Sequence, residues 1–252
     1  MISNPQFPEE LIRALRQARK VVVLTGAGIS AESGIPTFRD PQDGLWSRFR
    51  PQDLATREAF ERDPRLVWNW YEWRRRLVRQ ARPNPGHLAL VRMESLLPDF
   101  TLVTQNVDGL HALAGSRRLL ELHGNILRNK CLGENLPMEP QPGDEGEPPV
   151  CSRCGSWLRP DVVWFGEGLP QQALDGALES TAQCDLFFAI GTSAAVSPAA
   201  ELPVMALQGG ALVVEINPEP TRLTGNVQLT LQGAAGPILS RMVMAAWPTA
   251  LN

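Results

Sequence analysis

The strongest candidate for a catalytic residue in this 252-residue chain is a histidine at the end of an apolar run. His123 follows the run 119–122 and precedes Gly124, so we expect it at the carboxyl end of a strand. An imidazole at that place has a pKa suited to proton transfer near neutral pH. The alternative is a hydrogen-bonded core histidine. Because residues 105–108 read Gln-Asn-Val-Asp after a second apolar run, the pattern favours a histidine that transfers protons.

The loop after the first apolar run has the spacing of a phosphate-binding turn. After residues 21–24, Gly26, Gly28 and Ala31 satisfy G-x-G-x-x-[G/A], in which small residues let backbone N–H groups approach a pyrophosphate at a helix N-terminus. The chain then enters the polar loop 32–40 rather than a long amphipathic helix, and such loops are usually functional. No acid-bearing second strand follows about 20 residues later, which argues against a hydride-transfer dehydrogenase.

Polar or glycine-rich residues follow every predicted strand, which indicates one ligand-binding crevice. The predicted strands are residues 21–24, 100–104, 119–122, 186–190 and 212–216. In an open parallel sheet, ligands bind outside the carboxyl ends of the strands. Ordinary turn chemistry explains any one of these strand ends, but it explains all five less well. We therefore expect an α/β fold: a Rossmann-like parallel sheet with helices on both faces, plus a smaller helical and zinc-binding module.

Helical periodicity supplies the elements that should cover and extend this sheet. Residues 8–20 and 87–97 predict helices on the sheet, and residues 54–80, rich in Arg, Trp and Leu, predict a helical insertion. The main, Rossmann-like domain is expected to comprise residues 1–40, 83–127 and 160–252. The small domain is expected to combine the helical insertion 41–82 with a zinc module at 128–159.

Three cysteines and a glutamate have the spacing of a metal site. Cys151 and Cys154 form a C-x-x-C pair, Cys131 stands upstream, and Glu134 occupies the place where a fourth thiolate usually completes a structural zinc site. Either Glu134 completes the tetrahedron, or another group does, or metal affinity is reduced. The alternative is inert thiols. Zinc is favoured over inert thiols because the acidic, Pro- and Gly-rich segment 134–149 should be a mobile surface loop without a core of its own. Such a segment needs a bound metal ion to stabilise it.

Bulk composition excludes several classes of partner. A net charge of −3 and a pI near 5.7 give no basic field for nucleic acid. No apolar run approaches the roughly 20 residues of a membrane helix, and residues 1–10 do not resemble a signal peptide. We expect a cytoplasmic protein without nucleic-acid or membrane partners.

His87 and Cys184 are expected to be structural, and His111 either positions its loop or lies on the surface.

Six signatures resemble those of the sirtuin family, in the order in which that family shows them. They are GAGISAESGIPTFRD at 26–40, TQNVDGLH at 104–111, LHG at 122–124, VVWFGE at 162–167, IGTS at 190–193 and VEINPE at 214–219. The resemblance implies an NAD-dependent protein-lysine deacylase with one structural zinc ion. NAD, the co-substrate, and an acylated lysine of a protein substrate would meet between the two domains. The products would be nicotinamide and O-acyl-ADP-ribose, because the acyl carbonyl oxygen attacks the ribose carbon as nicotinamide departs.

The resemblance also implies roles for individual residues. His123 is the implied general base, and Asn106 is the second implied catalytic residue. The implied NAD-binding residues are Gly26, Ala27, Gly28, Ser30, Ala31, Thr37, Phe38, Arg39, Gln105, Asn106, Val107, Asp108, Gly191, Thr192, Ser193, Asn217, Glu219 and Ala235. The implied acyl-lysine channel consists of Val163, Trp164, Phe165, Gly166 and Glu167. The backbone of that segment would pair with the substrate as an added strand.

Tyr71 and Arg74 indicate which acyl group is removed. They stand at i and i+3 on one face of a predicted helix. The pair is similar to the Tyr-x-x-Arg pair of class III sirtuins, which is associated with succinyl- and malonyl-lysine. A guanidinium can bind a carboxylate through two hydrogen bonds with a phenol beside it. The alternative is a solvated basic face, because Arg75, Arg76 and Arg79 adjoin.

The leading hypothesis is therefore a desuccinylase and demalonylase that also removes acetyl groups. A second hypothesis is protein mono-ADP-ribosyl transfer, which uses the same cleavage of NAD with a protein side chain as acceptor. A third, a non-catalytic NAD-sensing or zinc-based module, is disfavoured by the presence of His123, Asn106 and Asp108.

Overall fold

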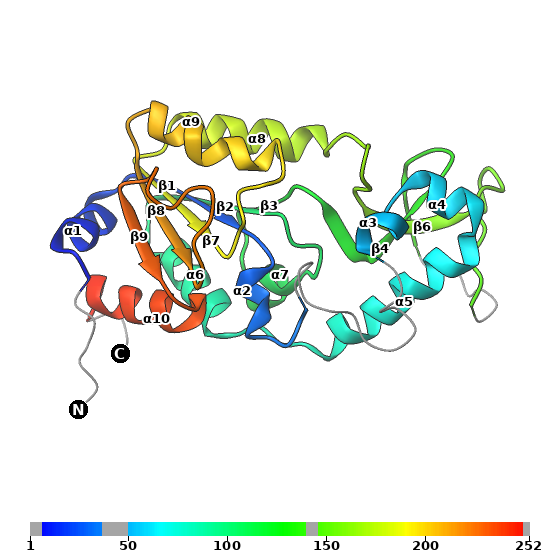
Figure 1. Cartoon of the computed structure of the whole chain (residues 1–252), viewed down its shortest axis with the longest axis horizontal. Coiled ribbons are helices and arrows are strands. Elements are labelled where there is room, and N and C mark those ends of the chain that lie inside the picture. The colour runs from blue at the N-terminus through cyan, green and yellow to red at the C-terminus, as the bar shows by residue number, and fades with distance from the viewer. Residues whose placement is uncertain (1–6, 37–49, 140–145, 249–252) are drawn as a thin grey trace.

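The molecule is elongated, with a helix-covered sheet at one end and a smaller group of helices and strands at the other (Figure 1). The computed structural model describes residues 7–36, 50–139 and 146–248. The predicted NAD-binding residues Thr37, Phe38 and Arg39 lie outside the described residues, as do residues 140–145 of the predicted surface loop. Among the described helices, none is long and apolar enough to cross a membrane.

Six parallel strands form the larger sheet. They are β1 (Lys20–Thr25), β2 (Asp99–Thr104), β3 (Leu119–Glu121), β7 (Leu186–Ile190), β8 (Leu212–Asn217) and β9 (Leu229–Gln232), in the spatial order β3-β2-β1-β7-β8-β9. In the register of the sheet, Val23 lies between Leu102 and Phe188. The strand order reverses between β1 and β7, which makes their carboxyl ends a topological switch point. The predicted Rossmann-like parallel sheet is confirmed.

Helices bury both faces of this sheet, which explains why its central strands are continuously apolar. The covering helices are α1 (Glu9–Gln17), α6 (Pro85–Leu96), α8 (Gln171–Ala182), α9 (Leu202–Gln208) and α10 (Ala235–Ala246). Val21 and Val23 belong to the core cluster of α1, α6 and α10, whereas Val22 and Leu24 belong to that of α8 and α9. Figure 1 shows α8 and α9 above the sheet and α10 below it. The predicted helices near the N-terminus and after Gly86 are thus confirmed.

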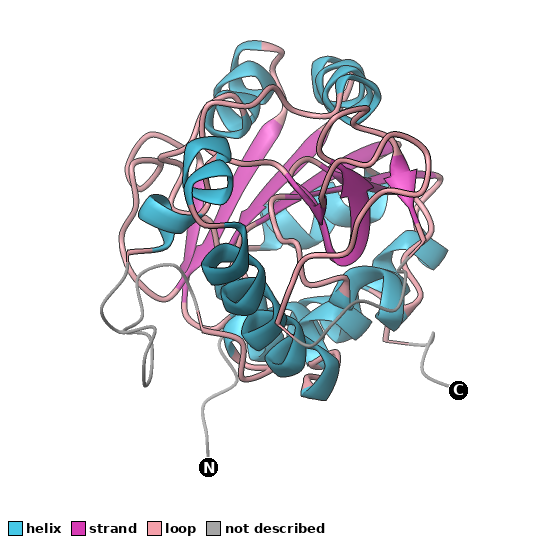
Figure 2. Cartoon of the chain, turned by 90° about the vertical axis from the view of Figure 1, so that its right-hand side faces the viewer, coloured by secondary structure: helices cyan, strands magenta, loops and turns pink. Residues whose placement is uncertain are grey.

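The smaller part combines short helices, one long helix and an antiparallel sheet, and Figure 2 views the molecule from its end. The helices are α3 (Pro51–Leu54), α4 (Arg57–Arg62) and α5 (Pro64–Gln80). The strands are β4 (Gly124–Cys131), β5 (Pro137–Met138) and β6 (Leu158–Val162), paired in the order β5-β4-β6. Helices α4 and α5 confirm the predicted helical insertion. Strands β4 and β6 run across the predicted limits of the zinc module, and the division into two domains remains a prediction.

Arg75 fastens α5 to β4. Its side chain is buried, its Nε donates to the carbonyl oxygen of Ile126 (2.6 Å), and its Nη2 donates to that of Arg128 (3.1 Å). The core beside this contact contains Trp70, Ile126 and Trp164. Hydrogen bonds from the buried Arg75 guanidinium to the backbone of β4 therefore add to the stability that the small apolar core provides.

Candidate functional site

The carboxyl ends of β1, β2, β7 and β8 are joined by hydrogen bonds at the switch point. Gln105 Nε2 donates to Thr192 Oγ1 (2.8 Å), and Asn217 Nδ2 donates to the carbonyl oxygen of Thr192 (2.9 Å). The Gly28 N–H donates to the carbonyl oxygen of Gly191 (2.9 Å). The structure therefore brings together polar residues that the sequence places after four separate strands.

The glycine turn and the loop after β7 touch backbone to backbone. A Cβ on Gly26 would lie 2.7 Å from the carbonyl oxygen of Gly191, and a Cβ on Gly28 would lie 2.7 Å from the Cα of Gly191. Gly191 has a φ of +58°, which favours glycine. Helix α2 (Gly28–Ala31), which follows, is only 4 residues long. The chain therefore makes a tight turn and one helical turn, as predicted, rather than a long helix.

Ser30, Asn106 and Asp108 form a buried polar cluster beside this turn. Ser30 Oγ donates to Asp108 Oδ2 (2.8 Å), and Asn106 Nδ2 donates to the Gly26 carbonyl oxygen (3.1 Å) and to Ser30 Oγ (3.2 Å). Burial raises the pKa of Asp108 above its ordinary value, although hydrogen bonds from Leu110 and Ser30 oppose the shift. The amide and the carboxyl group are thus held in fixed orientations next to the glycine backbone.

His123 is half-buried directly after β3 and is held in one tautomer. Its Nδ1 lies 2.9 Å from the carbonyl oxygen of Gln105. Because a carbonyl oxygen can only accept, Nδ1 carries the proton and Nε2 carries the lone pair. Within the described residues, Nε2 has no hydrogen-bond partner. Burial lowers the pKa of His123, against the hydrogen bond to Gln105, so the neutral imidazole is the form near neutral pH.

His87 and His111 form a buried pair, so the alternative that His111 lies on the surface is wrong. Their ring centroids are 4.8 Å apart. His111 Nε2 lies 3.0 Å from Thr25 Oγ1, and His87 Nδ1 accepts from the Asn84 N–H at the start of α6 (3.3 Å). Burial lowers the pKa of His87 to about 4 and that of His111 to about 3. Both rings are neutral parts of the core that supports the strand ends.

The predicted acyl-lysine segment, residues 163–167, lies beside His123. The Val163 N–H donates to the carbonyl oxygen of His123 (2.9 Å), and the Phe165 N–H donates to that of Ala55 (2.9 Å). Phe165 is 50% exposed, whereas its neighbour Trp164 is buried. The segment therefore connects the histidine at the end of β3 with the helical insertion.

Tyr71 and Arg74 share a face of α5, as predicted. Tyr71 is buried and its hydroxyl accepts a hydrogen bond from Trp164 Nε1 (2.9 Å). Arg74 Cζ lies 5.9 Å from the Tyr71 ring centroid, and Arg74 interacts electrostatically with Asp108. Burial raises the pKa of Tyr71 to about 12, against the charge of Arg74. Because Tyr71 and Arg75 are both buried, a solvated basic face is wrong for this side of the helix.

The predicted metal ligands converge in the smaller part. The ligand atoms of Cys131, Glu134, Cys151 and Cys154 all lie within 4.8 Å of one another. Cys131 Sγ and Cys154 Sγ are 3.3 Å apart, and no disulfide links the cysteines. Thiolate sulfur and carboxylate oxygen both bind zinc, so this donor set fits a structural zinc ion. Cys184 is buried elsewhere, as expected of a structural thiol.

The remaining predicted residues occupy the same loops. Ala27 and Ala31 lie in the glycine turn, Val107 and Ser193 follow Asn106 and Thr192, Gly166 follows Phe165, and Glu219 is exposed after β8. Ala235 begins α10, where the Gly236 N–H donates to Glu32 Oε1 (2.8 Å).

Sequence reasoning missed several residues that support the site. Thr25 Oγ1 donates to Thr104 Oγ1 (2.8 Å) between two adjacent strands. The buried carboxylate of Glu215 accepts from Thr224 Oγ1 (2.7 Å) and so ties down the loop after β8. A charged residue inside the apolar run 212–216 was the available signal for Glu215. Arg159, which holds the segment 163–167, stands outside the signatures and had no such signal.

Comparison with known proteins gives one consistent result. The family model described as the Sir2 family matches residues 26–198. A protein of Methylococcus capsulatus named NAD-dependent protein deacylase is 48% identical over 248 residues, 95% of this chain and 97% of the relative. A solved structure of a Sir2 homolog in complex with NAD has a TM-score of 0.89 at 43% identity and covers 96% of this chain and 95% of that chain. A solved structure described as Sir2 with a p53 peptide and NAD+ has a TM-score of 0.84 at 32% identity and covers 94% of this chain and 96% of that chain.

Proposed function

Because the chain belongs to the Sir2 family, we propose that it is an NAD-dependent protein-lysine deacylase of the cytoplasm with His123 as its general base. The observation that carries the proposal is the tautomer of His123, which leaves Nε2 able to accept a proton. The relative from Methylococcus capsulatus is named an NAD-dependent protein deacylase, and a similar structure contains a peptide and NAD+. The substrates are therefore NAD and an acylated lysine on a protein.

NAD, when bound, supplies a ribose carbon from which nicotinamide can depart. The tight contact between the Gly26–Gly28 turn and Gly191 fits a pyrophosphate-binding turn, since side chains are excluded there. Asn106 and Asp108 would hold the ribose and the nicotinamide amide in orientations fixed by Gly26 and Ser30. Positioning of this kind is what a cation-like transition state requires, rather than a strong nucleophile.

His123 would accept a proton at Nε2 from a ribose hydroxyl. The Nδ1–H bond to the carbonyl oxygen of Gln105 keeps the ring oriented and stabilises the charge that forms on it. The neighbouring Val163 would pair its segment with the substrate backbone, which places an acyl-lysine next to the base.

Tyr71 and Arg74 are proposed to select succinyl and malonyl groups. The guanidinium supplies charge-assisted hydrogen bonds to a carboxylate, and the phenol remains protonated because burial raises its pKa to about 12. Acetyl groups, which lack the carboxylate, would be removed less efficiently.

One experiment tests both the activity and the acyl preference. Acetyl, succinyl and longer acyl versions of one peptide are incubated with NAD, and deacylated lysine and acyl-ADP-ribose are measured by mass. We expect both products, with succinyl preferred, and Arg74→Met should lower desuccinylation more than deacetylation. Arg76→Met is the matched control, because Arg76 is exposed on the same helix. Nicotinamide release without acylated peptide, together with a mass gain on protein, would instead indicate mono-ADP-ribosyl transfer.

We also propose that Glu134 is the fourth ligand of the structural zinc ion. Its carboxylate is placed with the three thiols, and Arg153 Nε donates to its Oε2 (2.9 Å). A hydrogen bond of this kind to a ligating carboxylate orients it toward the metal. The site would then hold three sulfur ligands and one oxygen ligand.

Cobalt substitution counts the sulfur ligands of this site. Purified wild-type protein should contain one zinc per chain, and its cobalt form should show the thiolate-to-metal absorption of three sulfurs. Glu134→Cys should raise that absorption by roughly a third, because a fourth thiolate then binds the metal, and Glu134→Gln should weaken zinc retention against a chelator. Glu139→Gln, an exposed neighbour, is the control. Unchanged retention in Glu134→Gln would show that another group completes the site.

A further inference from the structure

A buried arginine holds the segment that carries Trp164. Arg159, on β6, is 2% exposed, and its Nη2 donates to the carbonyl oxygen of Val162 (2.6 Å) and to Glu167 Oε2 (3.0 Å). Its Nη1 pairs with the second oxygen of the same carboxylate. The guanidinium also stacks on Trp164, with Cζ 3.2 Å from the ring centroid. A two-pronged ion pair and a stacked cation therefore fix this segment at both ends.

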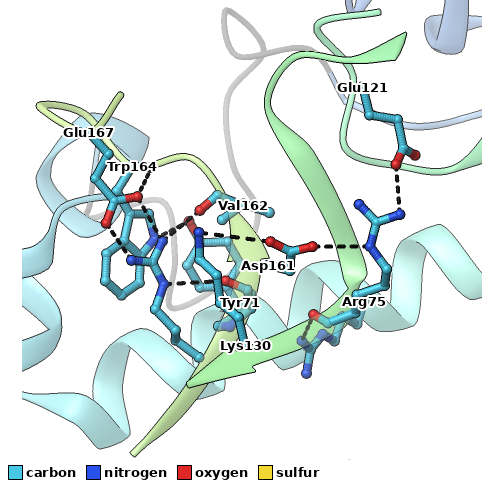
Figure 3. A network of polar contacts seen from close by, with 11 residues as sticks. Tyr71, Arg75, Glu121, Lys130, Asp161, Val162, Trp164 and Glu167 are labelled. Carbon is cyan, nitrogen blue, oxygen red and sulfur yellow. Dashed lines mark hydrogen bonds and ion pairs between the residues drawn. The ribbon is translucent and has the colours of Figure 1, made fainter. Parts of the chain in front are cut away.

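Trp164 links the segment held by Arg159 to the helical insertion. Its backbone N–H donates to Glu167 Oε2 (2.9 Å), and its ring packs against Phe60 with centroids 5.4 Å apart. Its indole N–H donates to the Tyr71 hydroxyl (2.9 Å). Figure 3 shows Trp164 lying between Tyr71 and Glu167 in this network. The chain of contacts therefore runs from Arg159 to the phenol proposed to select the acyl group.

The direction of the last hydrogen bond decides what Tyr71 can do. An indole nitrogen is only a donor, so the Tyr71 hydroxyl must accept from Trp164. The hydroxyl proton is then directed elsewhere, and no residue in the described part of the chain accepts it. Because the phenol stays protonated at neutral pH, that proton is available to a ligand. Arg74, 5.9 Å from the same ring, supplies a positive charge beside it.

We propose that Trp164, held by Arg159 and Glu167, is a positioning residue that makes the Tyr71 hydroxyl a donor to an anionic acyl group. A hydroxyl donor next to a guanidinium favours a carboxylate over a neutral methyl group. The indole bond fixes this arrangement before the substrate arrives, which avoids the entropy of ordering the hydroxyl on binding. This inference rests on the proposed acyl preference and names the residues that enforce it.

The kinetic test uses Trp164→Phe and Tyr71→Phe, alone and combined, with Trp157→Phe as the matched control. Trp157 is 38% exposed and lies apart from this network. Values of kcat and KM are measured for succinyl and acetyl versions of one peptide at saturating NAD. Trp164→Phe should lower the succinyl-to-acetyl ratio of kcat/KM about 3- to 10-fold, the worth of one hydrogen bond, mainly through the KM of the succinyl peptide. Trp157→Phe should leave the ratio unchanged.

The double variant tests whether Trp164 acts through Tyr71. If it does, Trp164→Phe should lower the ratio no further once Tyr71 is Phe. Independent, multiplying effects of the two changes would overturn the inference, and so would an equal fall in kcat for both peptides.

A spectroscopic readout is independent of turnover. The chain has 7 tryptophans, and Trp164→Phe identifies the Trp164 indole N–H signal in a proton–nitrogen correlation spectrum. Tyr71→Phe should shift this signal more than any other indole signal, and an unmoved signal would contradict the hydrogen bond. Arg159→Met should shift it too, with partial recovery in Arg159→Lys. If Arg159→Met does not fold, Arg159→Lys should still give a smaller shift and a lower acyl ratio.

The wild-type data separate this inference from the proposed function. Wild-type protein that removes acetyl but not succinyl groups would overturn both the acyl preference and the role of Trp164. Wild-type protein that prefers succinyl groups, combined with independent effects of Trp164→Phe and Tyr71→Phe, would overturn the inference alone.

Discussion

The strand ends of the larger sheet and the smaller part of the molecule are held by different kinds of interaction. At the strand ends, Gly28, Asn106 and Asn217 are fixed by neutral hydrogen bonds, many of them to backbone groups. In the smaller part, the buried arginines Arg75 and Arg159 bind carboxylates and carbonyl oxygens. The first arrangement follows from the parallel topology, whereas the second depends on a few individual side chains.

This difference predicts where a substitution should damage chemistry and where it should damage the fold. A parallel sheet with two helical layers buries enough apolar surface to tolerate polar changes at its strand ends. Removing one partner of a buried ion pair leaves an uncompensated charge, which is strongly destabilising. Variants at the strand ends should therefore lose activity and keep stability, while variants of the buried arginines should lose stability.

His123→Ala should give the largest effect on activity. Loss of a general base lowers kcat by about 10²- to 10⁴-fold. The half-buried ring donates a hydrogen bond to the carbonyl oxygen of Gln105 and adds little else to the fold, so the urea midpoint should change little. Activity is measured by mass on acylated peptide, with Ala112→Ser, an exposed site, as control. Retained activity would remove His123 from the mechanism, and an unfolded variant would contradict the proposed independence of site and fold.

Arg75→Met should give the largest effect on stability. The change removes donors to Ile126 and Arg128 and leaves Glu72 only its longer ion pair with Arg79 (3.9 Å), so the free energy of unfolding should fall by about 3–5 kcal/mol. Arg79→Met, on the exposed face of the same helix, should change it by less than about 0.5 kcal/mol. Urea unfolding measures both. Equal effects of the two substitutions would show that the smaller part does not depend on its buried charge.

The same contrast explains what the sequence could predict. The strands of the main sheet are continuous apolar runs, so their positions and polar ends were predictable, except for β9, where Leu229 and Leu231 alternate with polar residues. The strands of the smaller part carry charged residues such as Arg128 and Asp161, so their sequences lack the continuous apolar run by which the strands of the main sheet were predicted. The convergence of three cysteines with Glu134 followed from spacing. The role of Arg159 did not, because only the folded chain brings it onto Trp164.

Acid should destabilise the main sheet through the buried pair His87 and His111. The pKa of His87 is lowered to about 4 and that of His111 to about 3, against about 6.5 in an unfolded chain. The unfolded chain therefore binds more protons below pH 6.5, so stability is full above that value and falls as pH drops toward 4. For His87 alone the loss approaches about 3 kcal/mol. His111→Gln should flatten the fall in urea midpoint between pH 7.5 and pH 5, and an unchanged slope would exclude His111 as a source.

Arg128→Met should give the smallest effect, because its charge lies on the surface between the two parts. Arg128 pairs with Glu121 Oε2 (2.7 Å) and Asp161 Oδ2 (3.1 Å), yet its side chain is 51% exposed. Exposed ion pairs contribute about 0–1 kcal/mol and are screened by salt. The variant should therefore lose less than about 1 kcal/mol at low salt and nothing measurable in about 1 M sodium chloride. Arg13→Met, an exposed change on α1, is the control. A larger loss that salt does not remove would mean that the charge-based cohesion of the smaller part extends to its surface and joins it to β3.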